Sequence, residues 1–146
     1  MFREDTKQNI IYSNSICHAF ALIGISQDFH EDILKDRLYI PMNEMKSFKL
    51  EISDIYNKKF NTEWKSYKGY WLRRIEKILL DGRPLIQNTK GRLRLQIKIM
   101  VSAAFLLIRR MSDEDCDLFN DPPKISKIDW LVLFFRCIFT NHGEPK

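Results

Sequence analysis

The segment Asp81–Met100, "DGRPLIQNTKGRLRLQIKIM", decides the fold, because its apolar residues fit two different secondary structures. Strict alternation in Arg92–Ile99 predicts a β-strand with a basic outer face and four apolar side chains inside: Leu93, Leu95, Ile97 and Ile99. The same residues also satisfy a helical period that continues to Ile108, so one long helix beginning near Gly91 is the alternative. We favour a β-hairpin followed by a helix over residues 99–111.

On both sides of this segment, apolar spacing and capping residues predict five further helices, over residues 13–23, 27–39, 44–60, 69–80 and 127–140. Gly24 suits the end of the first helix and Ser26 the beginning of the second. Ser126, followed by Asp129 three residues later, has the spacing of a capping box at the start of the last helix.

The predicted architecture is mainly α, a compact helical domain with a winged-helix-like centre and one short β-hairpin. We expect a single domain over residues 1–146, with the winged-helix-like centre at about 44–99 and a C-terminal helical extension at about 99–140. A chain of this length, 45% hydrophobic, is long enough to bury one core. Its expected members include Phe20, Phe48, Ile52, Tyr56, Trp71, Ile75, Phe105, Leu131 and Phe135.

Cysteine spacing and hydropathy limit the compartment and the chemistry. Cys17, Cys116 and Cys137 form no close pair, which argues against a disulfide framework or a metal site, and no cofactor is expected. The longest apolar run, "WLVLFF", is far shorter than the roughly 20 residues of a membrane span. These features predict a cytoplasmic or nuclear protein with no membrane partner.

Positive charge is concentrated in the middle of the chain. Residues 46–110 hold sixteen Lys and Arg against five Asp and Glu, a net charge of +11 in a chain whose total is +5. Such asymmetry suggests an anionic partner, RNA more than DNA. The alternative is that these side chains only solvate helices or pair with the flanking acids. The candidate nucleic-acid-binding residues are Lys65, Lys68, Arg73, Arg74, Lys77, Arg92 and Arg94.

Within this block, Lys65–Lys77, "KSYKGYWLRRIEK", interleaves basic and aromatic side chains. Trp71, Ile75 and Ile78 recur at helical spacing and should face the core, which turns Arg73 and Lys77 towards solvent. Any platform for base stacking then comes from a tyrosine, either Tyr67 or Tyr70.

Residues 47–97 resemble the LOTUS (OST-HTH) winged-helix-like family. The likeness rests on an apolar first helix, the pair Gly69-Tyr70 opening a second helix, and the closing "GRLRLQI". It is carried further by Leu50, Ile52, Ile55, Tyr56, Phe60, Leu72, Ile75 and Leu79. The resemblance implies a non-enzymatic adaptor that binds structured RNA or a DEAD-box RNA helicase.

No sequence motif indicates an enzyme, and the acidic "DEDCD" at 113–117 reads as a solvated loop. We therefore expect a binding module rather than a catalyst. An alternative is an all-helical protein-protein interaction or dimerisation domain, including a viral adaptor that binds a host regulator. The last helix is apolar nearly all round, so it could dock on a protein partner or a second copy through Trp130, Phe134 and Arg136.

Overall fold

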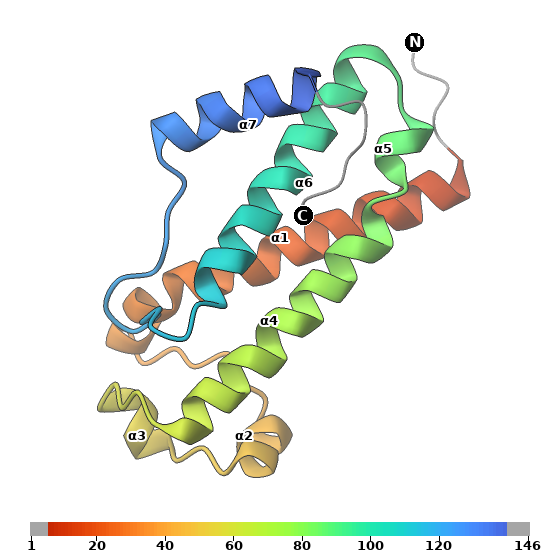
Figure 1. Ribbon diagram of the computed structural model, residues 1–146. Coiled ribbons are helices and arrows are strands. Elements are labelled where there is room, and N and C mark those ends of the chain that lie inside the picture. The colour runs from red at the N-terminus through yellow and green to blue at the C-terminus, as the bar shows by residue number, and fades with distance from the viewer. Residues whose placement is uncertain (1–5, 140–146) are drawn as a thin grey trace.

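The computed structural model describes residues 6–139, and within this range it contains seven helices and no strand (Figure 1). The helices are α1 (Lys7–Leu34), α2 (Met42–Phe48), α3 (Ile52–Tyr56), α4 (Thr62–Gly82), α5 (Leu85–Asn88), α6 (Gly91–Met111) and α7 (Lys127–Phe139). The prediction of a mainly helical fold is confirmed. The predicted β-hairpin is wrong.

Two long helices, α1 and α4, lie against each other and form the centre of the molecule (Figure 1). Helix α6 packs on both of them, α7 lies on α6, and the short α2 contacts α4. Buried side chains from all three long helices meet between them, among them Ile23, Leu72, Ile75, Leu79 and Met111. The core is therefore a helix-on-helix interior with no sheet.

Helix α1 replaces the two helices predicted over 13–23 and 27–39. Gly24 and Ser26 were expected to separate them, but both lie inside α1. The hydroxyl of Ser26 donates to the backbone carbonyl of Leu22, 2.9 Å away, so it bonds back within the helix and caps nothing. Burial of one face from Ile16 to Ile33 supports a continuous helix.

The single helix predicted over 44–60 is instead two short helices, α2 and α3. Lys49 adopts the left-handed conformation with φ of 55°, and the amide of Leu50 donates to the carbonyl of Met45 over 2.9 Å. This is a Schellman ending, which stops α2 although no glycine marks the position.

The winged-helix-like centre is wrong because α6 is one helix through the whole of Gly91–Met111. Its second half buries Val101, Ala104, Leu107 and Ile108, and the first half continues that register. The alternating apolar residues are all only half-buried: Leu93, Leu95, Ile97 and Ile99. They therefore do not form the buried apolar face that a strand would need. Because propagation adds a hydrogen bond per residue, extending α6 backwards is favoured over a new hairpin.

Helix α7 confirms the predicted start and the predicted capping box. The amide of Ser126 donates to Asp129 Oδ2 over 2.7 Å, and the amide of Asp129 donates to Ser126 Oγ over 3.1 Å. The last residue of the predicted range, 140, lies outside the described residues.

The core prediction is right only in part. Ile75 is fully buried, and Phe20, Phe48, Trp71 and Phe105 pack at the edge of the core. Four others are exposed, namely Ile52, Tyr56, Leu131 and Phe135. The exposed residues belong to the short α3 and to α7, where periodicity alone did not reveal which face meets a neighbour.

Candidate functional site

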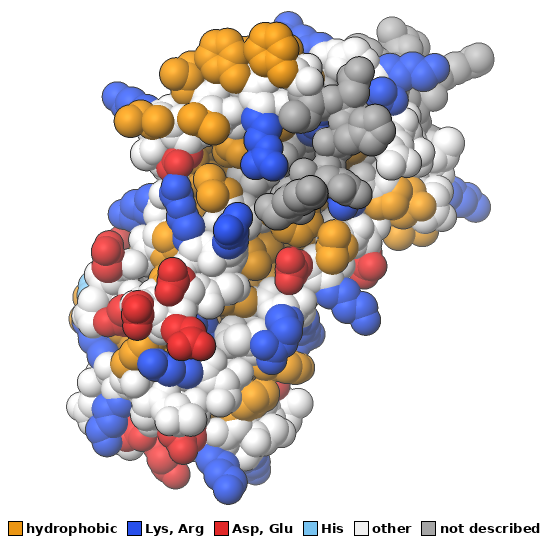
Figure 2. Space-filling model, viewed as in Figure 1, with side chains coloured by type: hydrophobic (Ala, Val, Ile, Leu, Met, Phe, Trp, Pro, Cys, Tyr) orange, Lys and Arg blue, Asp and Glu red, His pale blue; other side chains and the backbone are white. Residues whose placement is uncertain are grey.

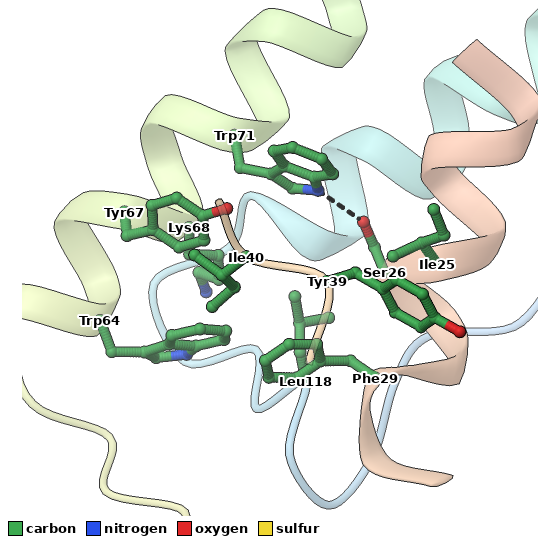
Figure 3. A pocket seen from close by; sticks show the side chains of 10 residues that line it. All are labelled: Ile25, Ser26, Phe29, Tyr39, Ile40, Trp64, Tyr67, Lys68, Trp71 and Leu118. Carbon is green, nitrogen blue, oxygen red and sulfur yellow. Dashed lines mark hydrogen bonds between the residues drawn. The ribbon is translucent and has the colours of Figure 1, made fainter. Parts of the chain in front are cut away.

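One end of the α1–α4 pair holds an apolar pocket of about 380 Å³, including the part open to solvent. Helix α1, the chain after it, α4 and the loop after α6 all contribute side chains, as Figure 3 shows. The lining residues are Ile25, Ser26, Phe29, Tyr39, Ile40, Trp64, Tyr67, Lys68, Trp71 and Leu118.

Aromatic rings form much of the pocket wall. Trp64 stacks on Phe29 with ring centroids 4.9 Å apart, and Phe119 lies behind them, 4.4 Å from Trp64. Tyr67 stacks on Trp71 at 6.2 Å. The spacing of Trp64, Tyr67 and Trp71 along α4 puts all three rings on the helix face that looks towards α1. These rings therefore give the pocket an apolar, aromatic wall.

Lys68 places a buried ammonium group beside these rings. The residue is 4% exposed, and its Nζ donates to the carbonyls of Asp113, 2.7 Å away, and Cys116, 2.9 Å away. Burial lowers the pKa of Lys68. Its charge is satisfied mainly by the loop after α6, which it holds against α4.

Few other polar groups face the pocket. Trp71 Nε1 donates to Ser26 Oγ over 2.9 Å, which ties α4 to α1 (Figure 3). The buried Nε1 of Trp64 has no hydrogen-bond partner within residues 6–139. Burial, and then the nearby carboxylate of Glu44, raise the pKa of Tyr67, so its hydroxyl stays protonated.

The loop between α6 and α7 is fastened to α1 at two points. The Nδ1–H of His30 donates to the carbonyl of Phe119, and Gln27 Nε2 donates to the carbonyl of Pro123 over 2.8 Å. These contacts hold Leu118 and Phe119, both buried, against the pocket. The acidic segment 113–117 was expected to be a solvated loop. Two of its backbone carbonyls instead accept hydrogen bonds from Lys68.

The seven candidate nucleic-acid-binding residues lie in different surroundings. Lys68 is buried, and Arg74 pairs with Glu44 at 2.8 Å. Arg94 donates to the carbonyls of Thr89 and Gln87, where α5 meets α6. All six residues apart from Lys68 are exposed, including Lys65, Arg73, Lys77 and Arg92. Arg73 and Lys77 thus lie on the solvent side of α4, as their spacing predicted.

The candidate partner-binding residues Trp130, Phe134 and Arg136 are all exposed on α7. Trp130 and Phe134 keep 45% and 43% of their surface accessible. Helix α7 is held to α6 by its two buried residues, Leu133 and Cys137. Arg110 adds an ion pair, with its NH2 nitrogen 2.6 Å from Asp129 Oδ1.

Carboxylates near the pocket do not assemble into a metal site. Asp28, Glu31 and Asp32 lie in the last turns of α1, where Glu31 pairs with Lys35 and Asp32 with Arg37. Among residues 6–139, no group of three or more His, Cys, Asp or Glu side chains is placed to hold a metal ion. The residues therefore do not fit a bound metal in this arrangement.

The pocket was not predicted because the helix expected over 69–80 begins after Trp64 and Tyr67. Asn61 is in fact the N-cap of α4, and its side chain accepts from the amide of Trp64 over 2.9 Å. The available signal was an aromatic and apolar series at three- and four-residue spacing: Trp64, Tyr67, Trp71 and Ile75.

The fold and the pocket define a mainly helical protein with an aromatic-walled apolar pocket. The family model described as squalene/phytoene synthase matches residues 1–129. The chain therefore belongs to the squalene/phytoene synthase family. Comparisons with curated proteins and with solved structures gave no match.

This membership corrects the functional expectations. The LOTUS (OST-HTH) resemblance over 47–97 is wrong, because the matched family covers the same residues and Gly91–Met111 forms a helix in place of the expected wing. The family is one of isoprenoid biosynthetic enzymes, so the predictions of a non-enzymatic adaptor, of RNA or DNA as partner and of a DEAD-box helicase are also wrong. None of the helices within residues 6–139 is long and apolar enough to cross a membrane.

Proposed function

We propose that this chain has a prenyl-transferase-like function in isoprenoid biosynthesis and that its pocket receives the hydrocarbon part of an isoprenoid substrate. The observation that carries the proposal is the family match, which spans residues 1–129 and so includes every residue that lines the pocket. Fold membership alone does not define chemistry, so the lining itself must suit the ligand.

The lining suits a branched hydrocarbon. Burying apolar surface contributes about 25 cal/mol per Å², and the wall offers aliphatic side chains from Ile25, Ile40 and Leu118 beside the aromatic rings. The enclosed part of the pocket is only about 30 Å³, so the rest of the space of about 380 Å³ is open to solvent. A short branched end of an isoprenoid chain would enter the enclosed part, with the rest of the substrate on the open side.

The aromatic wall also suits the reaction class. In prenyl transfer, the bond between an allylic carbon and its diphosphate breaks, diphosphate leaves, and positive charge develops on the allylic carbon. A new carbon–carbon bond then forms to the acceptor chain, which loses a proton. The negative face of an aromatic ring stabilises such a charge when it lies within about 6 Å of the ring centroid. On α4, the half-buried ring of Trp71 is the one placed to supply such a face, because Trp64 and Tyr67 are each 3% exposed.

Product analysis tests this function. The purified protein would be incubated with tritiated farnesyl diphosphate and Mg²⁺, and radioactivity extracted into hexane would be separated by chromatography. We expect a hydrocarbon product that is absent with heat-denatured protein. An exposed-surface variant, Leu34→Gln, should form it at the wild-type rate, because Leu34 is 67% exposed and does not line the pocket. Recovery of unchanged substrate alone would contradict the proposal.

A further inference from the structure

Residues 112–126, between α6 and α7, form one wall of the pocket without being part of a helix. Leu118 lines the pocket, and Phe119 beside it is fully buried. The ring of Phe119 packs against two rings of the wall, at 5.6 Å from Phe29 and 4.4 Å from Trp64. We call residues 112–126 the strap, because they run from α6 past the end of α1 to the start of α7 (Figure 1).

Side chains of α1 and α4 hold the strap by its backbone carbonyls. Lys68 donates to two of these carbonyls, while His30 and Gln27 donate to one each. The accepting residues are Asp113, Cys116, Phe119 and Pro123. Within residues 6–139, the backbone–backbone hydrogen bonds of the strap join residues at most four positions apart. The strap can therefore leave the pocket by giving up side-chain contacts, with no helical hydrogen bond broken.

The outer side of the strap faces water. Four of its acidic residues are exposed: Asp113, Glu114, Asp115 and Asp121. Figure 2 shows acidic side chains gathered where Figure 1 places the chain between α6 and α7. Leu118 and Phe119, by contrast, are buried. An outward movement of the strap thus keeps its charges solvated and uncovers two apolar side chains.

The closed pocket is too small for a prenyl chain. Its enclosed part, about 30 Å³, has room for roughly two water molecules, so the end of a prenyl chain can enter only as a wall moves. Helices α1 and α4 pack on each other through the core, which fixes the other main wall. Withdrawal of Phe119 would leave an apolar slot against Phe29 and Trp64. Because both of these rings line the pocket, the slot and the pocket would then be one space.

We propose that the strap is a displaceable wall of the pocket, and that an isoprenoid chain fills the space left by Leu118 and Phe119 when the strap opens. The apolar surface of that chain replaces the apolar contacts that the two side chains give up, which offsets the cost of opening. The ligand in this proposal rests on the proposed function, whereas the opening is a property of the protein alone.

Thiol labelling tests the opening without any ligand. Leu118→Cys puts a thiol at a position that is 3% exposed, and Ala104→Cys puts one in the core on α6, where the exposure is 0%. Each protein would be treated with a maleimide, and peptide mass spectrometry would separate the new cysteine from the three native ones. We expect Leu118→Cys to react at least roughly tenfold faster than Ala104→Cys, because local opening needs no global unfolding. Equal rates would overturn the proposal.

A variant of one fastening contact, with a matched control, tests what holds the strap closed. Gln27→Leu removes the donor to the carbonyl of Pro123, whereas Asp28→Asn changes the neighbouring exposed residue. Gln27→Leu should speed the labelling of Leu118→Cys about twofold to tenfold, the factor that one lost hydrogen bond gives, and leave that of Ala104→Cys unchanged. Labelling of both cysteines that rises to the same degree would reflect a loss of global stability and would overturn the local opening.

Farnesyl diphosphate binding gives a readout that a merely structural contact would not improve. The apparent Kd is the intrinsic Kd divided by the open fraction, so a more open strap tightens binding. In equilibrium dialysis, Gln27→Leu should bind about twofold to tenfold more tightly than wild type, and Asp28→Asn should match wild type. Equal or weaker binding by Gln27→Leu would overturn the displaceable wall. If none of the three proteins binds, the proposed function is contradicted, and the labelling rates still decide whether the strap opens.

Discussion

Lys68 shows how one side chain can join the pocket to a distant loop. Its ammonium group crosses from α4 to the carbonyls that follow α6, at 2.7 and 2.9 Å, while its carbon chain lines the pocket. From the sequence, Lys68 is indistinguishable from Lys65, three residues earlier, which is exposed and lies over the ring of Phe60. Local periodicity cannot separate the two, because the partners of Lys68 are about 45 residues away.

Replacing Lys68 by Met should destabilise the protein by about 1–3 kcal/mol, because two carbonyls lose their donor in a mostly buried setting. Lys65→Met is the matched control, and a change within about 0.5 kcal/mol is expected at this exposed position. Urea unfolding of the two variants measures the difference. Equal stabilities would show that the two carbonyl contacts contribute nothing.

Asp129 is the corresponding anchor for α7, and it makes part of the stability depend on pH. The hydrogen bond from Arg110, and then those from Ser126, hold the pKa of Asp129 well below its ordinary value. A carboxyl group with a depressed folded-state pKa contributes stability that is present above its unfolded pKa, about 3.9, and lost as pH falls towards the folded value.

Asp129→Asn should therefore be less stable than wild type at pH 6, and the difference should shrink as pH falls below about 4. Chemical denaturation across this range gives the unfolding free energy of both proteins at each pH. Glu114→Gln, at an exposed loop position, is the control. A gap that does not change between pH 6 and pH 3 would contradict the role of the ionised carboxylate.

Among the helices, the sequence reveals α7 well because its start is a local feature, the capping box of Ser126 and Asp129. The other boundaries depend on tertiary packing. Ser26 reads as a cap in sequence, but its hydroxyl accepts from Trp71 and bonds back within α1. Alternation in Arg92–Ile99 predicts a strand. The residues after it bury one face of a helix, and Arg92–Ile99 continue that helix instead. Neither outcome is visible without the neighbouring helices.

Among the glycines of α1 and α4, Gly82 lies closest to the neighbouring helix. A Cβ added there would lie 2.7 Å from the carbonyl oxygen of Tyr12 and 2.6 Å from Ile16 Cγ1. Gly82→Ala should therefore cost about 1–3 kcal/mol, because the helices must separate.

Gly24→Ala is the matched control within α1, since nothing lies within 4 Å of an added Cβ. It should stabilise the protein by up to about 1 kcal/mol through the higher helix propensity of alanine. Thermal melts compare the two variants. A Gly82→Ala protein that melts at or above the wild-type temperature would show that α1 and α4 do not pack as described.

At the scale of the whole molecule, the sequence predicted a helical chain with one substantial core but placed its function in the wrong class. The +11 central block suggested a single basic surface, yet folding buries Lys68, pairs Arg74 with Glu44 and places Arg94 on backbone carbonyls. The pocket, by contrast, is assembled from segments between Ile25 and Leu118. No local motif marks such a site, because its residues meet only through the packing of α1 on α4.

The most direct test of the account is the affinity of the pocket for a prenyl diphosphate. Equilibrium dialysis with tritiated farnesyl diphosphate would compare wild type with Ile25→Trp, which fills the pocket from a half-buried position, and with Leu34→Trp, an exposed site on the same helix. We predict saturable wild-type binding, a Kd at least roughly tenfold higher for Ile25→Trp, and no change for Leu34→Trp. Wild-type protein that binds no farnesyl diphosphate, or an Ile25→Trp variant that binds it as well as wild type, would contradict the assignment of this pocket as the isoprenoid site.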